Sequence, residues 1–137
     1  MSAIKAKNTK PELFFRKKLF SKGYRYSLYS TQVPGHPDMF LRKYNTAVFI
    51  HGCFWHRHAG CKYCYMPKSR TEYWTKKFLS NTARDDRVRH ELADKRIKCL
   101  IVWECTVKRM KKEPVFCEEM LQKVEKYLVS PEMYCEI

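Results

Sequence analysis

Five cysteine and histidine side chains fall within twelve residues near the middle of the chain: Cys53, His56, His58, Cys61 and Cys64. Zinc prefers thiolate and imidazole ligands in a tetrahedron, and short spacings between its ligands are usual. Cys53 and His58 are the first candidates, together with either Cys61 or Cys64. Cys105 follows a predicted strand and could return to the same corner, so that one ion would staple a loop to a distant strand end.

The cysteines as a whole indicate a reduced protein rather than a disulfide framework. The chain holds 7 cysteines, an odd number, and its N-terminus lacks the apolar core of a secretion signal. We expect Cys99 and Cys117 to be small buried hydrophobic residues, and Cys135, near the C-terminus, to be exposed.

A carboxylate and a strand-end histidine indicate a second kind of metal chemistry. Asp38 follows Pro37 at the start of an apolar run, and another run ends about a dozen residues later at His51. Such a corner suits Mg²⁺, which prefers oxygen ligands and keeps waters that a phosphate oxygen can replace. An aspartate after proline is more often a turn residue. The strongly basic chain nevertheless favours a phosphodiester substrate, and with it the metal interpretation.

The histidines His51, His56 and His58 offer imidazoles for proton transfer as well as for metal binding. An ordinary histidine pKa of about 6.5 suits a group that activates water near neutral pH. Glu12 and Asp85 could orient such imidazoles through hydrogen bonds. The sequence alone favours simpler roles for both, a helix cap for Glu12 and a solvated helix face for Asp85.

Phe54 and Trp55 stand inside this polar, ligand-rich loop. Large apolar rings on a rigid loop of a basic protein can wedge between base pairs. Burial in the core is an equally good interpretation of both rings. Trp74 and Trp103 are expected in the core, because they fall in a predicted helix and a predicted strand.

The elements that must position these residues begin with a helix and a hairpin. Thr9 as N-cap and Glu12 closing a capping box predict a helix that ends at Gly23. Three short apolar segments follow, and they predict a strand over residues 24–28 and a β-hairpin over residues 38–41 and 46–50.

The second half of the chain alternates a loop, helices and a strand. Residues 51–68 are expected to be irregular, and Ser69 and Glu72 repeat the capping-box pattern. The elements expected next are a long helix over about 70–95 with a break near Ser80–Asn81, a buried strand over 97–103 and a last helix from Pro114. This order predicts an α/β fold with a central mixed sheet flanked by helices.

Length and charge narrow the class of protein. The 137 residues allow one domain, which we expect to span residues 1–137. The chain has 28 Lys+Arg against 14 Asp+Glu, and this net charge of +14 favours a polyanionic partner. The apolar runs are well short of the roughly 20 residues that cross a bilayer. We therefore expect a cytoplasmic, nucleoid-associated protein with no membrane partner.

Four longer strings carry a resemblance to a known family. They are His51–His58, Pro34–Asp38, Arg70–Trp74 and Ile101–Cys105. Together they resemble the very short patch repair endonucleases, which are mismatch-specific nickases with a restriction-endonuclease-like fold. The resemblance runs in order over nearly the whole chain, from Ser2-Ala3-Ile4 to the last helix.

The resemblance implies a catalytic site built around Mg²⁺. Asp38 would be the acidic ligand, and the main-chain carbonyl of Ile50 would be another. His56 would act as general base or orient the attacking water, with Asp85 behind it. His51 would pair with Glu12 near the scissile phosphate.

The resemblance also implies a zinc-stapled loop and a DNA wedge. Its structural zinc would be held by Cys53, His58, Cys61 and Cys105. Phe54 and Trp55, helped by Met1, would intercalate beside the mismatch. The substrate would be double-stranded DNA, nicked 5′ of the thymine in a T:G pair left by deamination of 5-methylcytosine. We expect a monomer with a functional link to a cytosine-5 DNA methyltransferase.

Three departures from the family pattern bear on these roles. Met1 stands at the start of the chain, where we expect it to wedge less firmly. Ile50 replaces a threonine of the best-known members, so only its backbone carbonyl carries over. The spacing from His58 to Cys61 is one residue longer than in those members, which leaves Cys64 as a rival ligand.

Two other functions account for part of the same pattern. A zinc-stapled DNA-binding module without nuclease activity explains the charge and the aromatic residues, but not Asp38, His51 and His56 together. A sequence-specific nuclease of the same fold would cut matched sites as fast as mismatched ones.

Overall fold

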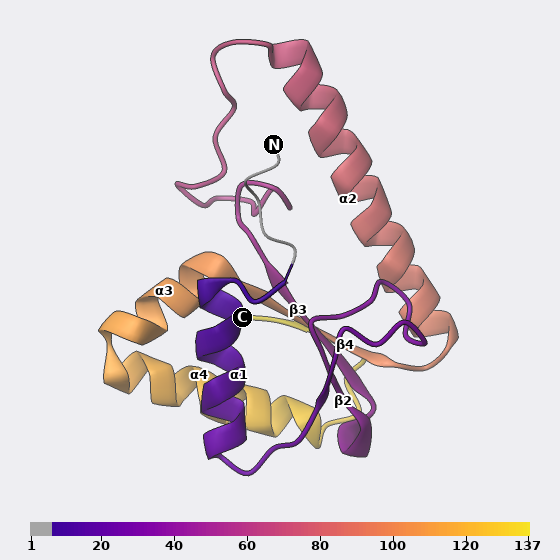
Figure 1. Cartoon of the computed structure of the whole chain (residues 1–137), viewed down its shortest axis with the longest axis vertical. Helices are drawn as coiled ribbons and strands as arrows, with labels where there is room; N and C mark the ends of the chain where they lie inside the picture. The colour runs from indigo at the N-terminus through magenta and orange to yellow at the C-terminus, as the bar shows by residue number, and fades with distance from the viewer. Residues whose placement is uncertain (1–6) are drawn as a thin grey trace.

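The computed structural model describes residues 7–137 and has a mixed five-stranded sheet at its centre (Figure 1). The strands lie in chain order across the sheet. The first three pair antiparallel, and the third, fourth and fifth pair in parallel. Their bounds are Ser27–Leu28 (β1), Met39–Leu41 (β2), Thr46–His51 (β3), Lys98–Trp103 (β4) and Tyr134–Glu136 (β5).

Helices flank this sheet, as the α/β order predicts. Their bounds are Lys10–Ser21 (α1), Thr71–Asp94 (α2), Glu104–Lys112 (α3) and Pro114–Leu128 (α4), with a short 3-10 helix, η1, over Arg42–Tyr44. Figure 1 shows α1, α3 and α4 gathered against the sheet, while the N-terminal turns of α2 extend away from it. No helix within residues 7–137 is long and apolar enough to cross a bilayer.

Alternating side chains of β3 and β4 divide the core into two layers. Val48 and Leu100 face the layer that contains α1, α3 and α4. Phe49 and Ile101 face the opposite layer, where Leu92 near the end of α2 packs. Because successive side chains of a strand point to opposite faces, two central strands covered on both faces read as continuous apolar runs.

Several predicted elements are confirmed. α1 begins after Thr9, whose hydroxyl accepts the Glu12 N–H at 3.4 Å. The hairpin forms with Met39 opposite Val48. Cys99 and Cys117 are buried, as expected for small hydrophobic residues.

Other predictions are wrong in instructive ways. Ser69 does not cap α2, because Arg70 takes the N-cap place in a left-handed conformation without a side-chain cap. α2 runs unbroken through Ser80–Asn81. The first strand is limited to Ser27–Leu28. The elements α3 and β5 were not predicted at all.

Candidate active site and metal centre

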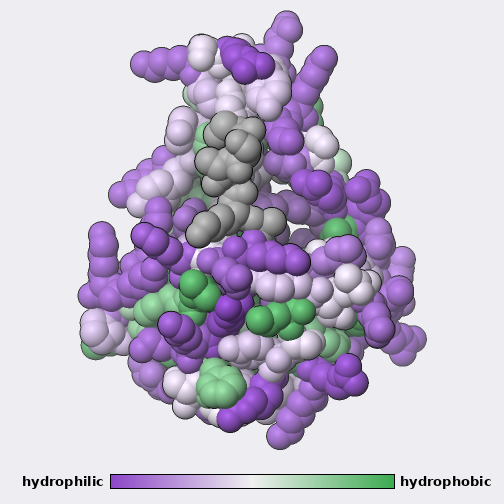
Figure 2. All heavy atoms as spheres, viewed as in Figure 1, coloured by the Kyte–Doolittle hydropathy of each residue, from purple (hydrophilic) through white to green (hydrophobic). Residues whose placement is uncertain are grey.

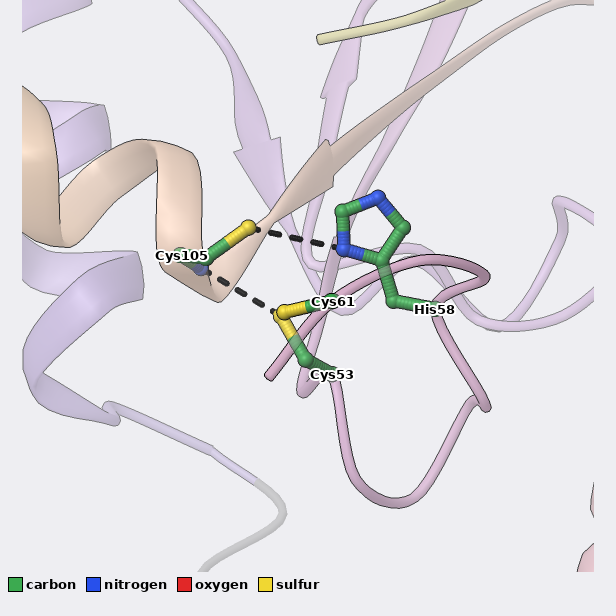
Figure 3. Close-up of side chains that lie close together, drawn as sticks. All are labelled: Cys53, His58, Cys61 and Cys105. Carbon is green, nitrogen blue, oxygen red and sulfur yellow. Dashed lines mark hydrogen bonds between the residues drawn. The ribbon is translucent and has the colours of Figure 1, made fainter. Parts of the chain in front are cut away.

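Cys53, His58, Cys61 and Cys105 come together where the loop after β3 meets the start of α3, in what we call the cysteine corner (Figure 3). Each offers one ligand atom, and these atoms all lie within 4.8 Å of one another. The first three belong to the loop after β3, whereas Cys105 lies in the first turn of α3. The cluster therefore joins a loop to the distant end of β4, as predicted.

The donor set of this cluster fits zinc. Three sulfurs and one imidazole nitrogen are a usual tetrahedral set. The Cys105 N–H donates to Cys53 Sγ at 3.4 Å, and Cys105 Sγ lies 3.4 Å from His58 Nδ1. Burial raises the pKa of the fully buried Cys53 to about 12, so a thiolate there needs a cation beside it. Cys64 is not part of the cluster that the described residues form.

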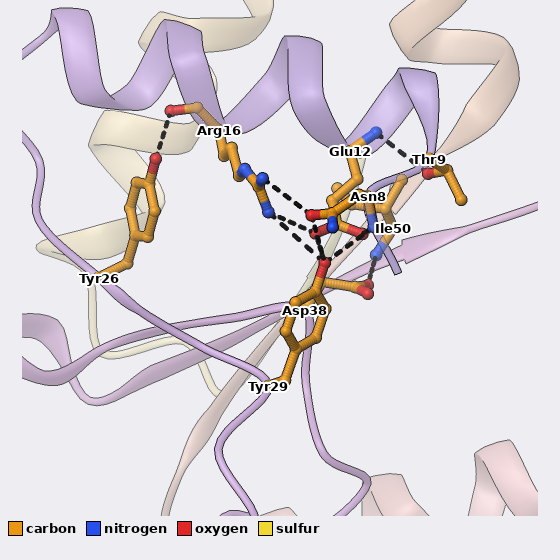
Figure 4. Close-up of polar contacts among 8 residues, drawn as sticks. All are labelled: Asn8, Thr9, Glu12, Arg16, Tyr26, Tyr29, Asp38 and Ile50. Atoms are coloured by element: carbon orange, nitrogen blue, oxygen red, sulfur yellow. Dashed lines mark hydrogen bonds and ion pairs between the residues drawn. The ribbon is translucent and has the colours of Figure 1, made fainter. Parts of the chain in front are cut away.

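Asp38 lies immediately before β2 and bonds to the neighbouring strand (Figure 4). The Ile50 N–H of β3 donates to Asp38 Oδ2 at 2.7 Å. Burial raises the Asp38 pKa to about 6; the Ile50 hydrogen bond lowers it, and the nearby charge of Glu12 raises it further. At neutral pH, burial therefore makes the charged form of this carboxylate energetically unfavourable, and a bound cation would stabilise it.

The N–H of Ile50 faces Asp38, and its C=O points to the same side of β3. In an antiparallel pair, the N–H and C=O of one residue point to the same neighbouring strand. Continuing the register from Met39 and Val48 puts Pro37 opposite Ile50. Proline has no N–H to offer, so the Ile50 carbonyl gains no ladder bond from that position.

His51 and His56 form a stacked pair next to Asp85. Their ring centroids are 3.8 Å apart and their planes differ by 5°. His56 Nδ1 lies 2.7 Å from Asp85 Oδ2, which leaves Nε2 of that ring free of this contact. Burial, then the neighbouring His56, lowers the His51 pKa to about 3, so that ring is neutral at physiological pH.

Parallel stacking sets the chemistry available to this pair. A metal ion binds imidazole in the plane of the ring, and two parallel planes do not share such a point. His51, His56 and Asp85 lie close enough to suggest a metal cluster, but the stacked rings suit proton transfer better. His56 with Asp85 has the geometry of an oriented base.

Glu12 lies on α1, close to these groups, with only 1% of its surface exposed. Its carboxylate accepts from Arg16 at 2.9 Å and from the Tyr29 hydroxyl. The expected pair between Glu12 and His51 is not formed among the described residues. Arg16 and Tyr29 occupy the carboxylate, and the His51 ring is stacked on His56.

One cleft of about 850 Å³ brings the predicted catalytic residues together. Its lining includes Glu12, Asp38, Ile50, His51, His56 and Asp85. Lys77, Arg84 and Arg89 of α2 line it as well and place basic side chains beside these carboxylates. Hydrophilic side chains also dominate the face seen in Figure 2, where hydrophobic residues form small separate patches. A carboxylate and an oriented imidazole with basic side chains nearby can hydrolyse a phosphate ester.

Phe54 and Trp55 are half-buried and lie outside the two core layers. Phe54 packs edge-on against Trp55, Trp74 and Phe78, with ring centroids 5.1–5.5 Å apart. Trp74 is also half-buried, so it belongs to this aromatic group rather than to the core. Met1 lies outside the described residues.

Asn81 is a site residue that the sequence analysis missed. It is 7% exposed, and its side-chain amide donates to the Trp55 carbonyl at 3.3 Å. Asn81 and Asp85 stand four residues apart on α2, so the two side chains hold Trp55 and His56 from successive turns. The four-residue spacing of Asn81 and Asp85 on a predicted helix was the sequence feature that could have indicated Asn81.

Comparison with known proteins places the chain among nucleases. A family model described as "DNA mismatch endonuclease Vsr" matches residues 1–62. The chain is similar to the Type II nicking enzyme V.NmeAIP of Neisseria meningitidis, with 41% identity over 124 residues, 90% of this chain and 85% of that protein. It is similar to the DNA mismatch endonuclease Vsr of Escherichia coli, with 32% identity over 131 residues, 93% and 80% of the two chains. The Type II nicking enzyme V.XorIIP of Xanthomonas oryzae is 42% identical over 105 residues, 77% of this chain and 76% of that one.

Proposed function

Because the chain belongs to the Vsr family of DNA mismatch endonucleases, we propose that it nicks DNA 5′ of the thymine in T:G mismatches. DNA nicking is the activity that the family carries; the lesion and the position of the cut are the proposed part. Deamination of 5-methylcytosine would supply the mismatch, which ties the protein to a cytosine-5 methyltransferase. One asymmetric lesion needs one active site, so we infer that it acts as a monomer. The mixed sheet is consistent with the restriction-endonuclease-like fold.

A single observation carries this proposal. Asp38, His56 and Asp85 come from three separate segments, and all line one cleft together with basic side chains of α2. A module that only bound DNA would need the basic side chains alone. An acid beside an oriented imidazole is what phosphodiester hydrolysis requires.

Asp38 and the Ile50 carbonyl would hold the catalytic Mg²⁺. Both offer the hard oxygen atoms that this ion prefers, and few protein ligands leave room for waters and a phosphate oxygen. When bound, Mg²⁺ would stabilise the charge on the phosphate and on the leaving 3′-oxygen. The raised pKa of Asp38 supports this assignment, because the side chain is held where its charge is poorly compensated.

The imidazoles would handle the proton of the attacking water. His56 would accept it at Nε2, and Asp85 at Nδ1 would stabilise the imidazolium that results. His51, with its pKa lowered to about 3, would stay neutral and hold the His56 ring by stacking. Glu12, bonded to Arg16 and Tyr29, would keep the α1 side of the cleft in place.

Cys53, His58, Cys61 and Cys105 would hold a structural zinc that fixes the loop carrying Phe54 and Trp55. Those two rings would wedge beside the mismatch. A T:G wobble pair unstacks more cheaply than a matched pair, so the wedge would favour mismatched DNA.

Matched-site nicking is the second candidate, because two of the similar proteins are named Type II nicking enzymes. The test uses end-labelled duplexes that differ only in one T:G or T:A pair, with Mg²⁺. We expect a nick beside the thymine of the T:G duplex alone. Equal cutting of both duplexes would favour the matched-site enzyme. Tight binding without any cut would favour a DNA-binding module.

A further inference from the structure

The indole of Trp103 lies between the cysteine-rich cluster and the catalytic imidazoles. It stacks on His58, with ring centroids 4.1 Å apart and planes within 5°. It also meets His51 edge-on, with centroids 5.4 Å apart and an interplanar angle of 72°. Trp103 is the last residue of β4 and is 9% exposed. One buried ring therefore touches a ligand of the proposed zinc and a histidine of the cleft.

Glu136 of β5 fixes the orientation of this indole. Trp103 Nε1 donates to Glu136 Oε1 at 2.8 Å, and the Tyr134 hydroxyl donates to Glu136 Oε2 at 2.6 Å. Both carboxylate oxygens are therefore engaged by aromatic side chains. The backbone N–H of Trp103 also donates to the Ile137 carbonyl at 3.1 Å. Glu136 of β5 and the next residue, Ile137, thus hold Trp103 by its side chain and by its main chain.

These contacts form a continuous ladder of rings, from His58 through Trp103 and His51 to His56. Packed aromatic rings have few alternative arrangements, because interiors are dense and side chains sit in defined rotamers. The bond to Glu136, which is itself exposed, adds a directional constraint on how the indole turns in its slot. An apolar ring such as Phe would fill much of the same volume without that bond.

We propose that Trp103 is a positioning residue which, with its ring set by Glu136, transmits the geometry of the zinc-binding corner to His51 and His56. The proposal rests on the proposed function, since it assigns the cleft histidines to catalysis. A bound zinc would then do more than staple the fold, because fixing the His58 ring would also fix the plane against which Trp103 and His51 stack.

The experiment compares Glu136→Leu, which removes the acceptor, with Glu136→Gln, which keeps a carbonyl oxygen for the indole. Glu132→Leu is the matched control, because it removes the same charge from an exposed side chain of the same segment. The first readout is the NMR spectrum of the histidine rings, whose protons near the indole are displaced by its ring current. The others are zinc content, affinity for a T:G duplex and the single-turnover nicking rate.

We expect Glu136→Leu to shift the His51 and His58 ring resonances, to keep the zinc content and duplex affinity of the Glu132→Leu control, and to slow nicking about tenfold, as a small misplacement of a catalytic group would. Glu136→Gln should restore both the resonances and the rate. Unchanged histidine resonances in Glu136→Leu would overturn the proposal, and so would a slow rate explained fully by lost zinc.

A second variant and a readout that needs no substrate complete the experiment. If Glu136→Leu does not fold, Trp103→Phe replaces it, since this variant keeps a stacking ring and loses only the N–H donor and part of the ring area. The NMR measurement needs no substrate. A parent protein that nicks no duplex would refute the proposed function, while the histidine resonances would still decide whether Trp103 and Glu136 set the ring geometry.

Discussion

The two ligand-rich regions of this protein differ in chemistry and in openness. The corner of Cys53, His58, Cys61 and Cys105 presents four soft or borderline ligands within 4.8 Å. The cleft, of about 850 Å³, is lined by Asp38 and Ile50, whose carboxylate and main-chain carbonyl are the oxygen ligands that we propose for Mg²⁺. A closed tetrahedral set leaves no position for a substrate, whereas a sparse oxygen set leaves several. The corner is therefore suited to holding the chain together, and the cleft to reacting with a bound phosphate.

The two regions also differ in how the chain builds them. The corner takes three of its four ligands from one short loop, with only Cys105 arriving from elsewhere. The cleft collects Asp38, His56 and Asp85 from separate segments, and it depends on the sheet and α2 for its geometry. Damage to the corner should therefore unfold the loop, while damage to the cleft should leave the fold intact.

Removing a ligand of the corner should have the largest effect. Cys105→Ser leaves three ligands and breaks the link between the loop and α3. We expect loss of stoichiometric zinc and a fall in the unfolding free energy of several kcal/mol, since structural zinc contributes folding energy directly. Metal analysis and thermal melting measure both. Cys64→Ser is the control and should keep its zinc. Zinc loss in Cys64→Ser but not in a Cys61→Ser variant would instead make Cys64 the ligand.

Neutralising the cleft carboxylate should raise the free energy of unfolding, whereas removing a corner ligand should lower it. A pKa raised to about 6 in the folded protein means that stability is fully present below the unfolded value and is lost as pH rises through 6. Without Mg²⁺, we expect Asp38→Asn to be more stable than the parent at pH 8, by at most about 3 kcal/mol. The gap should close toward pH 4.

Urea unfolding of both proteins across this pH range measures that gap. Both chains carry the same thiol ligands, so any loss of zinc at low pH affects them alike and cancels in the difference. If the parent were as stable as Asp38→Asn at pH 8, the charge of Asp38 would not destabilise the fold, and this difference between the corner and the cleft would be wrong.

A substitution in the loop between the two regions should have the smallest effect, and that effect should be on the choice of duplex. Trp55 lines the cleft, and removing its ring should weaken any wedge beside the mismatch. We expect Trp55→Ala to reduce the preference for T:G over T:A duplexes about tenfold, in line with stacking of roughly 1–3 kcal/mol per base. Phe20→Ala, which removes a 52% exposed ring on α1, should leave the ratio unchanged. An unaltered ratio in Trp55→Ala would make Trp55 a packing residue.

The corner could be predicted from the sequence more fully than the cleft. The corner ligands in the loop were visible as a local pattern, because spacing alone identifies ligands that are neighbours along the chain. Cys105 was placed correctly because an apolar run before it predicted a strand end. The sequence alone allowed a hydrogen bond from Asp85 to an imidazole but favoured a solvated helix face, and the family resemblance pointed to His56 as the partner that the structure shows.

The missed features depend on tertiary contacts. β5 has three residues and is recognisable only by its pairing with β4. The bounds predicted for the long helix agree with α2 to within a residue, but its cap is wrong, because Arg70, not Ser69, takes the N-cap position. Asn81 was read as a helix break, although burial and its bond to the Trp55 carbonyl satisfy it inside α2. Local propensity does not contain these contacts.

We assign the chemistry to the cleft and the integrity of the fold to the corner. Single-turnover nicking of a T:G duplex by zinc-loaded Asp38→Ala, with Mg²⁺ and saturating protein, tests this assignment. We predict that this variant keeps its zinc and binds the duplex like the parent, but nicks at least about 10³-fold more slowly, because the metal's charge stabilisation is lost. Nicking within tenfold of the parent rate would contradict the assignment of Asp38 and of the cleft.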